Sequence, residues 1–268
     1  MIRRPIKPAA AIALGILSLV LLLGGYTWLA HQQHVRNPDD TTIPKWSQLA
    51  DGVVTAFKVD KRSGERWIVE DVKATAGRYF LGLGSGLVGA LVIGMLMGCF
   101  TPIEAFGYPP LSLLAKIPPT AAMAVFFVLV GTDLNMYVAM IAFGVLPTLA
   151  LTVYLAVKEF PEELQFKAYT LGASHAEVIC SVIFRHVFPK LLDAARLVIG
   201  PALVYLIAAE MLVGDVGFGY RIRLQSKLLN MSVVYPYLAF LAVFGYAMDY
   251  GLRWLQRKWC PWFEKSKG

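Results

Sequence analysis

Long uncharged stretches alternate with short charged segments along this chain. A helix needs about 20 mostly apolar residues to cross a lipid bilayer. Five stretches are long enough, although Glu210 interrupts one of them, and a sixth is short unless it borrows residues across Lys116 or Asp133. The pattern predicts an all-α, polytopic membrane protein with about six transmembrane helices, at Ala9–Ala30, Tyr79–Ile103, Ile117–Thr132 (the short stretch), Leu134–Val157, Leu197–Gly214 and Leu228–Met248.

Basic residues flank the first and the last of these stretches, and Lys and Arg collect on the cytoplasmic side of membrane proteins. An even number of spans puts both termini on one side, so we expect both termini in the cytoplasm, together with the segment between the fourth and fifth spans. A cleaved signal peptide is the disfavoured alternative for the first stretch, because bulky Trp28 stands where a cleavage site needs a small residue. The net charge of +7 is then a topology signal and not a nucleic-acid footprint. The flanking basic residues are Arg3, Arg4, Lys7, Arg253, Arg257, Lys258, Lys265 and Lys267.

The cytoplasmic segment Phe160–Pro189 carries helix start and stop signals of its own. Pro161 suits the first position of a helix, and Gly172 can end that helix in the left-handed conformation. Ser174 and Glu177 form a capping box that starts a second helix, which we expect Pro189 to end. These signals predict a protruding helix–turn–helix, here called the handle, that a partner holds.

A stripe of small residues runs along the second span. Small residues let helix backbones approach closely in lipid, so we expect this stripe to be a packing face inside the bundle. Gly84, Gly86 and Gly89 also match a G-x-G-x-x-G nucleotide motif, but no strand precedes them and this alternative is disfavoured. The stripe residues are Gly82, Gly86, Ala90, Gly94 and Gly98.

The chain lacks the residue sets that catalysis or nucleotide hydrolysis would need. There is no G-x-x-x-x-G-K-[ST] phosphate loop and no converging Ser/His/Asp or carboxylate pair. His31 and His34 could begin a metal site, but without a third ligand nearby the better interpretation is a pair of polar residues at a helix exit. Cys99, Cys180 and Cys260 have no evident oxidising partner. We therefore expect no enzymatic activity, no catalytic residue, no metal, no cofactor and no disulfide in this chain.

Glu210 stands out because an acid within a membrane span is costly and usually faces the protein interior or a water-filled path. Two interpretations stay open: a pathway or gate residue, or a buried acid satisfied by a backbone N–H, by Tyr205 or by a basic group near the outer rim. Prolines in the spans suggest kinks beside a path. The candidates for the translocation path or gate are Glu210, Tyr205, Pro119 and Met123.

Two segments are expected on the outer side of the membrane. In the first, His31–Arg78, residues Trp46–Phe57 could form a short helix on the membrane surface. The second contains Arg221, Arg223 and Lys227, which could attract an anion or the acidic face of a partner. A solvated amphipathic segment is the alternative.

The handle resembles the cytoplasmic loop of binding-protein-dependent ABC importer permeases, a bacterial inner-membrane family. That loop reads E-A-A, three residues, G, nine residues, then I-x-L-P; here Phe166-Lys167-Ala168 replaces E-A-A and Phe184-Arg185 replaces L-P. The run Thr170-Leu171-Gly172-Ala173-Ser174 matches the family. Lys116-Ile117-Pro118-Pro119, Ala208-Ala209-Glu210 and Gly217-Phe218-Gly219-Tyr220 are similar to the nitrate/sulfonate/taurine-type branch.

The resemblance implies the type I permease fold and a homodimer. It also implies two cytoplasmic ATP-binding subunits that hold ATP and Mg²⁺, an extracytoplasmic solute-binding protein and surrounding membrane lipid. The expected parts are a first helix with its stub (1–30), an outer segment (31–78), a core of five spans (79–252) with a coupling loop (158–196), and a basic, aromatic tail (253–268). The implied ATPase-coupling residues are Lys167, Ala168, Thr170, Leu171, Gly172, Ala173, Ser174, His175 and Val178.

These features suggest the permease subunit of an ATP-driven importer of a small solute, for example a sulfonate such as taurine, nitrate or bicarbonate. The main alternative is a secondary transporter or channel without an ATPase. Such a protein would be expected to have more ionisable residues within its spans. A membrane-embedded enzyme is disfavoured because no catalytic set is present.

Overall fold

The computed structural model describes residues 7–38, 40–59 and 64–265. Arg3, Arg4 and Lys267, which contribute to the expected topology, lie outside this range. Most of the described residues are helical, and the only extended pairing among them is an isolated antiparallel bridge between Val59 and Arg66. This agrees with the all-α class that the hydrophobic pattern predicts.

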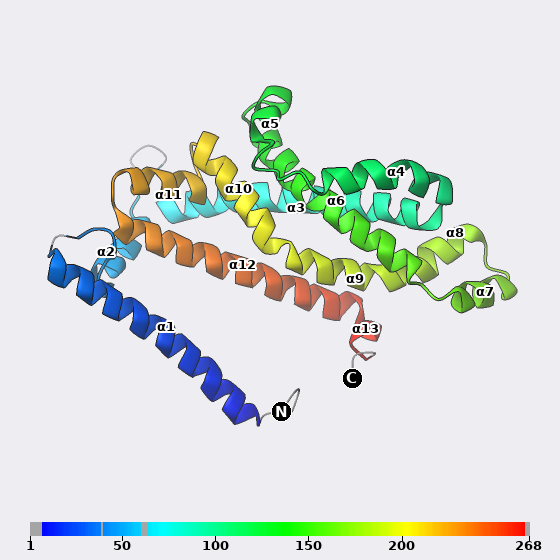
Figure 1. Cartoon of the computed structure of the whole chain (residues 1–268), viewed down its shortest axis with the longest axis horizontal. Helices are drawn as coiled ribbons and strands as arrows, with labels where there is room; N and C mark the ends of the chain where they lie inside the picture. Colours follow the sequence, from blue (N-terminus) through cyan, green and yellow to red (C-terminus); the bar gives the residue numbers. More distant parts are fainter. Residues whose placement is uncertain (1–6, 39, 60–63, 266–268) are drawn as a thin grey trace. The chain divides into compact units, whose positions relative to one another are not determined.

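The chain divides into two compact units. One contains residues 1–67 and 222–238, the other residues 68–221 and 239–268, and α11 and α12 each contribute to both. Figure 1 labels the helices. Their bounds are α1 (Pro8–Arg36), α2 (Trp46–Ala56), α3 (Trp67–Cys99), α4 (Thr101–Leu114), α5 (Met123–Val130), α6 (Leu134–Lys158), α7 (Glu162–Thr170), α8 (His175–Glu177), the π-helix η1 (Val178–Ile183), α9 (Phe184–Leu197), α10 (Ile199–Val213), α11 (Phe218–Lys227), α12 (Met231–Trp259) and α13 (Pro261–Lys265).

Within the first unit, polar contacts join α1 to the start of α2. The Tyr26 hydroxyl donates to the Pro44 carbonyl at 2.6 Å, and the Trp46 indole N–H donates to the Thr27 hydroxyl at 3.0 Å. The turn before α2 is held by Asp40, and a hydrogen bond from the Thr42 hydroxyl lowers the pKa of this carboxyl. The expected helix over Trp46–Phe57 is confirmed as α2.

In the second unit α6 lies at the centre and packs against α4, α5, α9 and α10. Its buried side chains include Met136, Met140, Ile141 and Val145. The glycine face of α3 also packs against α6: a Cβ added at Gly82 would lie 2.7 Å from Ile141. Polar contacts tie α9 to α12, because Arg196 pairs with Asp249 at 2.8 Å.

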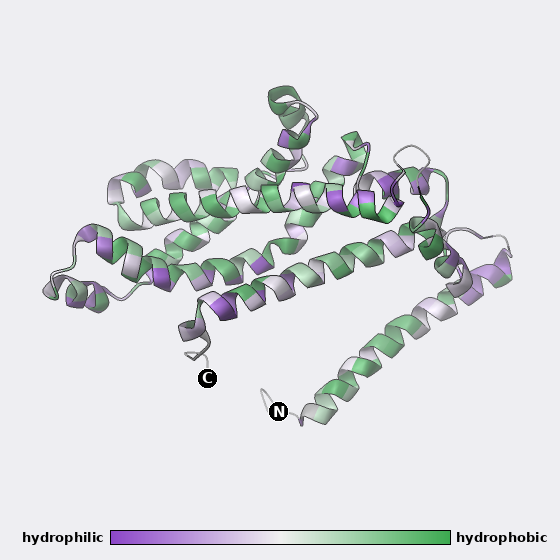
Figure 2. Cartoon of the chain, turned by 180° about the vertical axis from the view of Figure 1, so that it is seen from behind, coloured by the Kyte–Doolittle hydropathy of each residue, from purple (hydrophilic) through white to green (hydrophobic). Residues whose placement is uncertain are grey.

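Four described helices are long and apolar enough to cross a membrane: α1, α3, α6 and α12. The bent pair formed by residues 175–197 and α10, with a 48° break, makes a fifth. The short stretch Ile117–Thr132 contains only α5, of eight residues, after a turn at Pro118 and Pro119. Figure 2 shows the apolar residues along these helices. No residue is buried in the most apolar 18-residue window of α1, although Ala30 and His34 near the end of the helix are.

Two expected helix boundaries are wrong. Pro161 precedes the first turn with an extended ψ of 124°, and α7 begins one residue later, at Glu162. Pro189 does not end a helix; it lies buried inside α9, which continues to Leu197. The apolar face of α9 buries Val187 and Leu191 against the core, and this packing outweighs the hydrogen bond that proline cannot donate.

Candidate functional site

The turn of the handle is a regular helix-ending motif. Gly172 has φ = +85°, a conformation that suits glycine. Its N–H donates to the Tyr169 carbonyl at 2.9 Å, and the N–H of Ala173 donates to the Ala168 carbonyl at 3.1 Å. These two bonds make a Schellman motif. They leave the Leu171 side chain 88% exposed at the tip.

The second arm of the handle starts with the predicted capping box. The Ser174 N–H donates to the Glu177 carboxylate at 2.8 Å, and the Glu177 N–H donates to the Ser174 hydroxyl at 3.3 Å. The rings of Tyr169 and His175 also meet across the turn, with the Tyr169 oxygen 3.0 Å from His175 Nδ1. Hydrogen bonds from both α7 and α8 therefore hold the turn of the handle in one conformation.

The π-helix η1 connects the handle to the bundle. Val178 and Ile183 are buried in the core cluster, and Val187 follows them in α9. Single π-turns inside helices are rare and often occur at functional sites. The handle therefore has an exposed apolar tip at Leu171 and a base whose side chains are buried in the core.

The second candidate site surrounds Glu210, whose side chain is completely buried. One carboxylate oxygen, Oε1, accepts from Arg78 at 2.9 Å and from the Thr75 hydroxyl at 2.9 Å. The other, Oε2, accepts from the Gly219 N–H at 2.9 Å. Both oxygens are occupied, so the geometry corresponds to the second sequence interpretation: a buried acid satisfied by a backbone N–H and a basic group.

A second buried ion pair lies beside the first. Asp71 accepts from Arg221 Nε at 2.9 Å, and both side chains are almost fully buried. Arg78 also donates to the Val216 carbonyl at 2.7 Å and stacks on the Tyr137 ring, 4.2 Å from its centroid. Two acids and two arginines thus balance, which offsets part of the cost of burying each charge.

These side chains cap the start of α11. Three consecutive N–H groups, of Gly217, Phe218 and Gly219, donate to Asp71, Thr75 and Glu210 at 2.9, 3.0 and 2.9 Å. The first N–H groups of a helix lack intrahelical partners and carry partial positive charge, so buried carboxylates stabilise them. We call this network the α3–α11 clasp: Asp71, Thr75, Arg78, Glu210, Gly217, Gly219 and Arg221.

The glycines of the clasp are required by close approach to Glu210. A Cβ added at Gly217, where φ is +120°, would lie 2.6 Å from the Glu210 carboxylate, and one at Gly219 would lie 2.5 Å from the Ile207 carbonyl. Glycine is therefore needed at positions 217 and 219, because a larger side chain at either position would collide with α10.

The sequence interpretation missed Asp71, Thr75 and Arg78, because the charge map starts the second span at Tyr79. The sequence nevertheless contains a pattern that could have predicted this contact. Positions 71, 75 and 78 share one helix face, and polar residues on one face ahead of an apolar stretch indicate a buried polar contact.

Two of the other path candidates, Tyr205 and Pro119, lie against α6 around Gly144. A Cβ added there would lie 2.4 Å from the Tyr205 ring and 2.9 Å from Pro119. Met123 is buried in the same core cluster. Among the described residues, none of the hydrogen bonds of Glu210 involves these three.

The stripe of α3 makes the contacts of a packing face. Added Cβ atoms would lie 2.4 Å from Val145 at Gly86, 2.5 Å from the Ala150 carbonyl at Gly94 and 2.5 Å from Val157 at Gly98. Ala90 is completely buried. Gly84, off the stripe, has nothing within 4 Å of an added Cβ.

The matched pair Gly94→Ala and Gly84→Ala tests this packing face. Both changes raise helix propensity equally, but only the first drives a methyl group into a neighbouring backbone. We expect Gly94→Ala to be less stable than Gly84→Ala by about 1–3 kcal/mol. Thermal unfolding of the purified variants in detergent measures the difference, and equal midpoints would contradict it.

No group of three His, Cys, Asp or Glu lies close enough to hold a metal within the described ranges. His34, one of the two histidines considered, points its Nδ1 at the Ala30 carbonyl at 2.8 Å.

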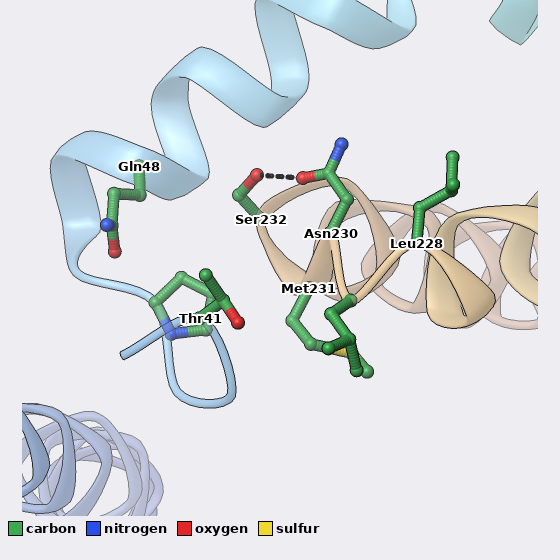
Figure 3. Close-up of a pocket in the computed structure, with 8 residues that line it drawn as sticks. Thr41, Gln48, Leu228, Asn230, Met231 and Ser232 are labelled. Atoms are coloured by element: carbon green, nitrogen blue, oxygen red, sulfur yellow. Dashed lines mark hydrogen bonds between the residues drawn. The ribbon is translucent and has the colours of Figure 1, made fainter. Parts of the chain in front are cut away.

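The first unit contains a hollow of about 390 Å³ beside the turn from α11 to α12. Thr41 and Gln48 line one side, and Asn230, Met231 and Ser232 line the other (Figure 3). The adjoining Leu229 has φ = +55° and its side chain is 61% exposed. A bulky residue held in the left-handed region is uncommon, which marks this turn for functional tests.

Comparison with known proteins identifies relatives of most of this chain. Residues 86–259 match the family model described as the binding-protein-dependent transport system inner membrane component. The taurine transport system permease protein of Escherichia coli (strain K12) is 25% identical over 72% of this chain and 70% of its own length. A Bacillus subtilis (strain 168) protein named as an aliphatic sulfonates transport permease is 28% identical over 81% of this chain and 78% of its own length.

Among solved structures, an inward-facing conformation of the MetNI methionine ABC transporter is similar. Its TM-score is 0.61 at 20% identity, and the likeness covers 72% of this chain and 95% of that chain. An amino acid ABC transporter chain gives a TM-score of 0.54 at 14% identity, over 73% of this chain and 92% of that chain. At this level of identity the likeness concerns the fold, which is that of a type I ABC importer permease.

Proposed function

Because this chain belongs to the family of binding-protein-dependent transport system inner membrane components, we propose that it forms the translocation path of an importer driven by a separate ATPase. Membership of the ABC permease family confirms the resemblance that the handle and the spans suggest. The protein is a multi-pass component of the inner membrane.

The observation that carries the coupling proposal is the pinned turn of the handle. Leu171 and Phe166 expose apolar side chains at 88% and 65%, while the turn behind them is held by a Schellman motif and a capping box. An exposed apolar tip on a rigid hairpin is suited to insertion into a cleft of another protein. We propose that the coupling contact consists of Lys167, Ala168, Thr170, Leu171, Gly172, Ala173, Ser174, His175 and Val178.

The proposed assembly contains two copies of a permease chain, two cytoplasmic ATPase subunits and an extracytoplasmic solute-binding protein. The ATPase subunits hold ATP and Mg²⁺. The loop 158–196 and both termini lie in the cytoplasm, and the hollow beside Leu229 lies on the outer side, where the binding protein delivers solute. A two-fold axis between identical permease chains would carry the path.

The proposed solute is a small anion of the sulfonate class, with nitrate and bicarbonate as further candidates. Relatives named for taurine and for aliphatic sulfonates support this class. Arg223 and Lys227 of α11 would supply positive potential on the outer side. Arg221 of the same helix is almost fully buried and pairs with Asp71.

We propose that Glu210 positions the outer end of the path and that Tyr205, Pro119 and Met123 lie nearer to the path. A buried carboxylate with both oxygens engaged is poorly placed to contact a passing solute. It instead joins α3, α10 and the start of α11 into one body.

A substitution at the handle tip tests the function directly. In Leu171→Asp a charge replaces the exposed apolar group, so we expect the ATPase subunits to be lost during co-purification and ATP-driven uptake to fall to background. Leu228→Asp is the matched control, with a leucine of 66% exposure that is expected on the outer side; it should retain the ATPase subunits.

Retention of the ATPase subunits and of uptake by Leu171→Asp would count against the coupling contact. Uptake by this chain in vesicles that lack any ATPase would favour the alternative of a secondary transporter or channel.

A further inference from the structure

A groove of about 600 Å³ lies between the root of the handle and the last described helix, α13. Its volume falls within the range of roughly 300–1,000 Å³ that is usual for small-molecule sites. The π-helix η1 and α9 contribute to its wall as well. We call it the tail groove, and its apolar lining comes from Phe160, Leu164, Val182, Pro189, Trp262 and Phe263.

Two nitrogen-bearing side chains, together with the Ser181 hydroxyl, give the tail groove its polar character. Arg185 is exposed at the groove and has no ion pair with any described residue. His186 stacks edge-on against Phe160, and its buried Nε2 lacks a hydrogen-bond partner among the described residues. The nearby cation Lys190 is already paired with Glu159 at 2.7 Å. No carboxylate is among the described residues that line the groove, so these residues present a positive charge beside an apolar surface.

The end of α12, which directly precedes α13 in the chain, carries residues typical of a membrane–water interface. Trp254 and Trp259 of α12 are about half exposed, and Lys258 lies 5.1 Å above the Trp254 ring. Tryptophan and basic residues gather at the headgroup level of the bilayer. The inner leaflet of cytoplasmic membranes carries anionic lipids that attract such clusters.

We propose that the tail groove binds an anionic phospholipid, with the phosphate on Arg185 and an acyl chain along Leu164, Val182 and Trp262. The proposal rests on the cytoplasmic position of the handle proposed above. A lipid in this groove touches α7 of the handle and α13 at once. Such a lipid would therefore stabilise the packing of the handle helix α7 next to the C-terminal helix α13.

Quenching of tryptophan by brominated lipids tests the proposal. The full chain is placed in phosphatidylcholine nanodiscs that contain a minor fraction of either brominated phosphatidylglycerol or brominated phosphatidylcholine, and the signal of Trp262 is the difference between the parent and Trp262→Phe. We expect phosphatidylglycerol to quench Trp262 at a mole fraction about fivefold lower, the factor expected from one basic residue near a membrane surface. Arg185→Gln should abolish this preference.

The matched control is Lys258→Gln, which removes one positive charge from the same tail but does not line the groove; it should retain the preference. Equal quenching by both lipids would overturn the proposal, and so would equal losses in Arg185→Gln and Lys258→Gln. Displacement of the brominated lipid by a soluble aryl sulfonate would assign the groove to a free organic anion instead. Neither transport nor ATP enters this measurement, so a failure of the importer proposal would be seen separately, as absent ATP-driven uptake.

Discussion

Replacement of Glu210 by alanine is expected to destabilise the permease more than any other single change considered for this chain. The substitution leaves the Arg78 guanidinium, 11% exposed, without its carboxylate, and leaves the Gly219 N–H without an acceptor. Removing one partner of a buried ion pair costs about 3–5 kcal/mol. We expect a markedly lower unfolding midpoint in detergent, less protein in the membrane and no uptake.

Asp215→Asn is the matched control for Glu210→Ala. Asp215 is 93% exposed and lies 3.9 Å from the same Arg78, and exposed pairs contribute only about 0–1 kcal/mol. A double-mutant cycle with Arg78→Leu and Glu210→Leu would measure the coupling, and the double variant should be less damaged than the sum of the single variants. A Glu210→Ala protein as stable as the parent would show that the clasp does not hold α11 in place.

Replacement of Gly172 by proline is expected to leave the bundle folded but to uncouple uptake from ATP hydrolysis. Proline fixes φ near −65°, whereas Gly172 has φ = +85° and donates its N–H to Tyr169. A conflict of about 3 kcal/mol depopulates the native turn by about a hundredfold. Because nothing lies within 4 Å of a Cβ added at Gly172, the damage should stay local.

Uptake and ATP hydrolysis should be measured together in vesicles that contain the Gly172→Pro protein with its ATPase subunits. Gly172→Ala should retain part of the uptake, because alanine bears only the cost of about 1–2 kcal/mol for a left-handed residue. Gly64→Pro makes the same backbone change in the segment between α2 and α3, at φ = +72°, and should transport normally. Normal uptake by Gly172→Pro would remove the lever from the mechanism.

Local signals in the sequence were sufficient for the turn of the handle. Gly172, Ser174 and Glu177 act over three to six residues, where backbone conformation and capping energies dominate. Pro189 shows the limit of this reasoning. Its local preference is to break a helix, but α9 is part of a buried apolar face, and packing energy from distant residues prevailed.

The start of the second span shows the same limit for charged residues. The charge map excluded positions 70–78 from the span, because isolated charges are costly in lipid. In the structure α3 begins at Trp67 and buries Asp71 completely. Its partner Arg221 lies 150 positions along the chain, a separation that no local pattern spans.

The sequence by itself determined the membrane class, the handle and its family, because hydrophobic period, helix caps and short motifs depend on neighbouring residues. Only the tertiary structure decided which groups surround Glu210 and which glycines face which partners. Burial of a charge is decided by the groups that meet it, and those groups come from helices far apart in the chain. The same holds for the tail groove. Its lining residues Phe160, Arg185 and Trp262 are far apart in the sequence and lie together only after the chain has folded.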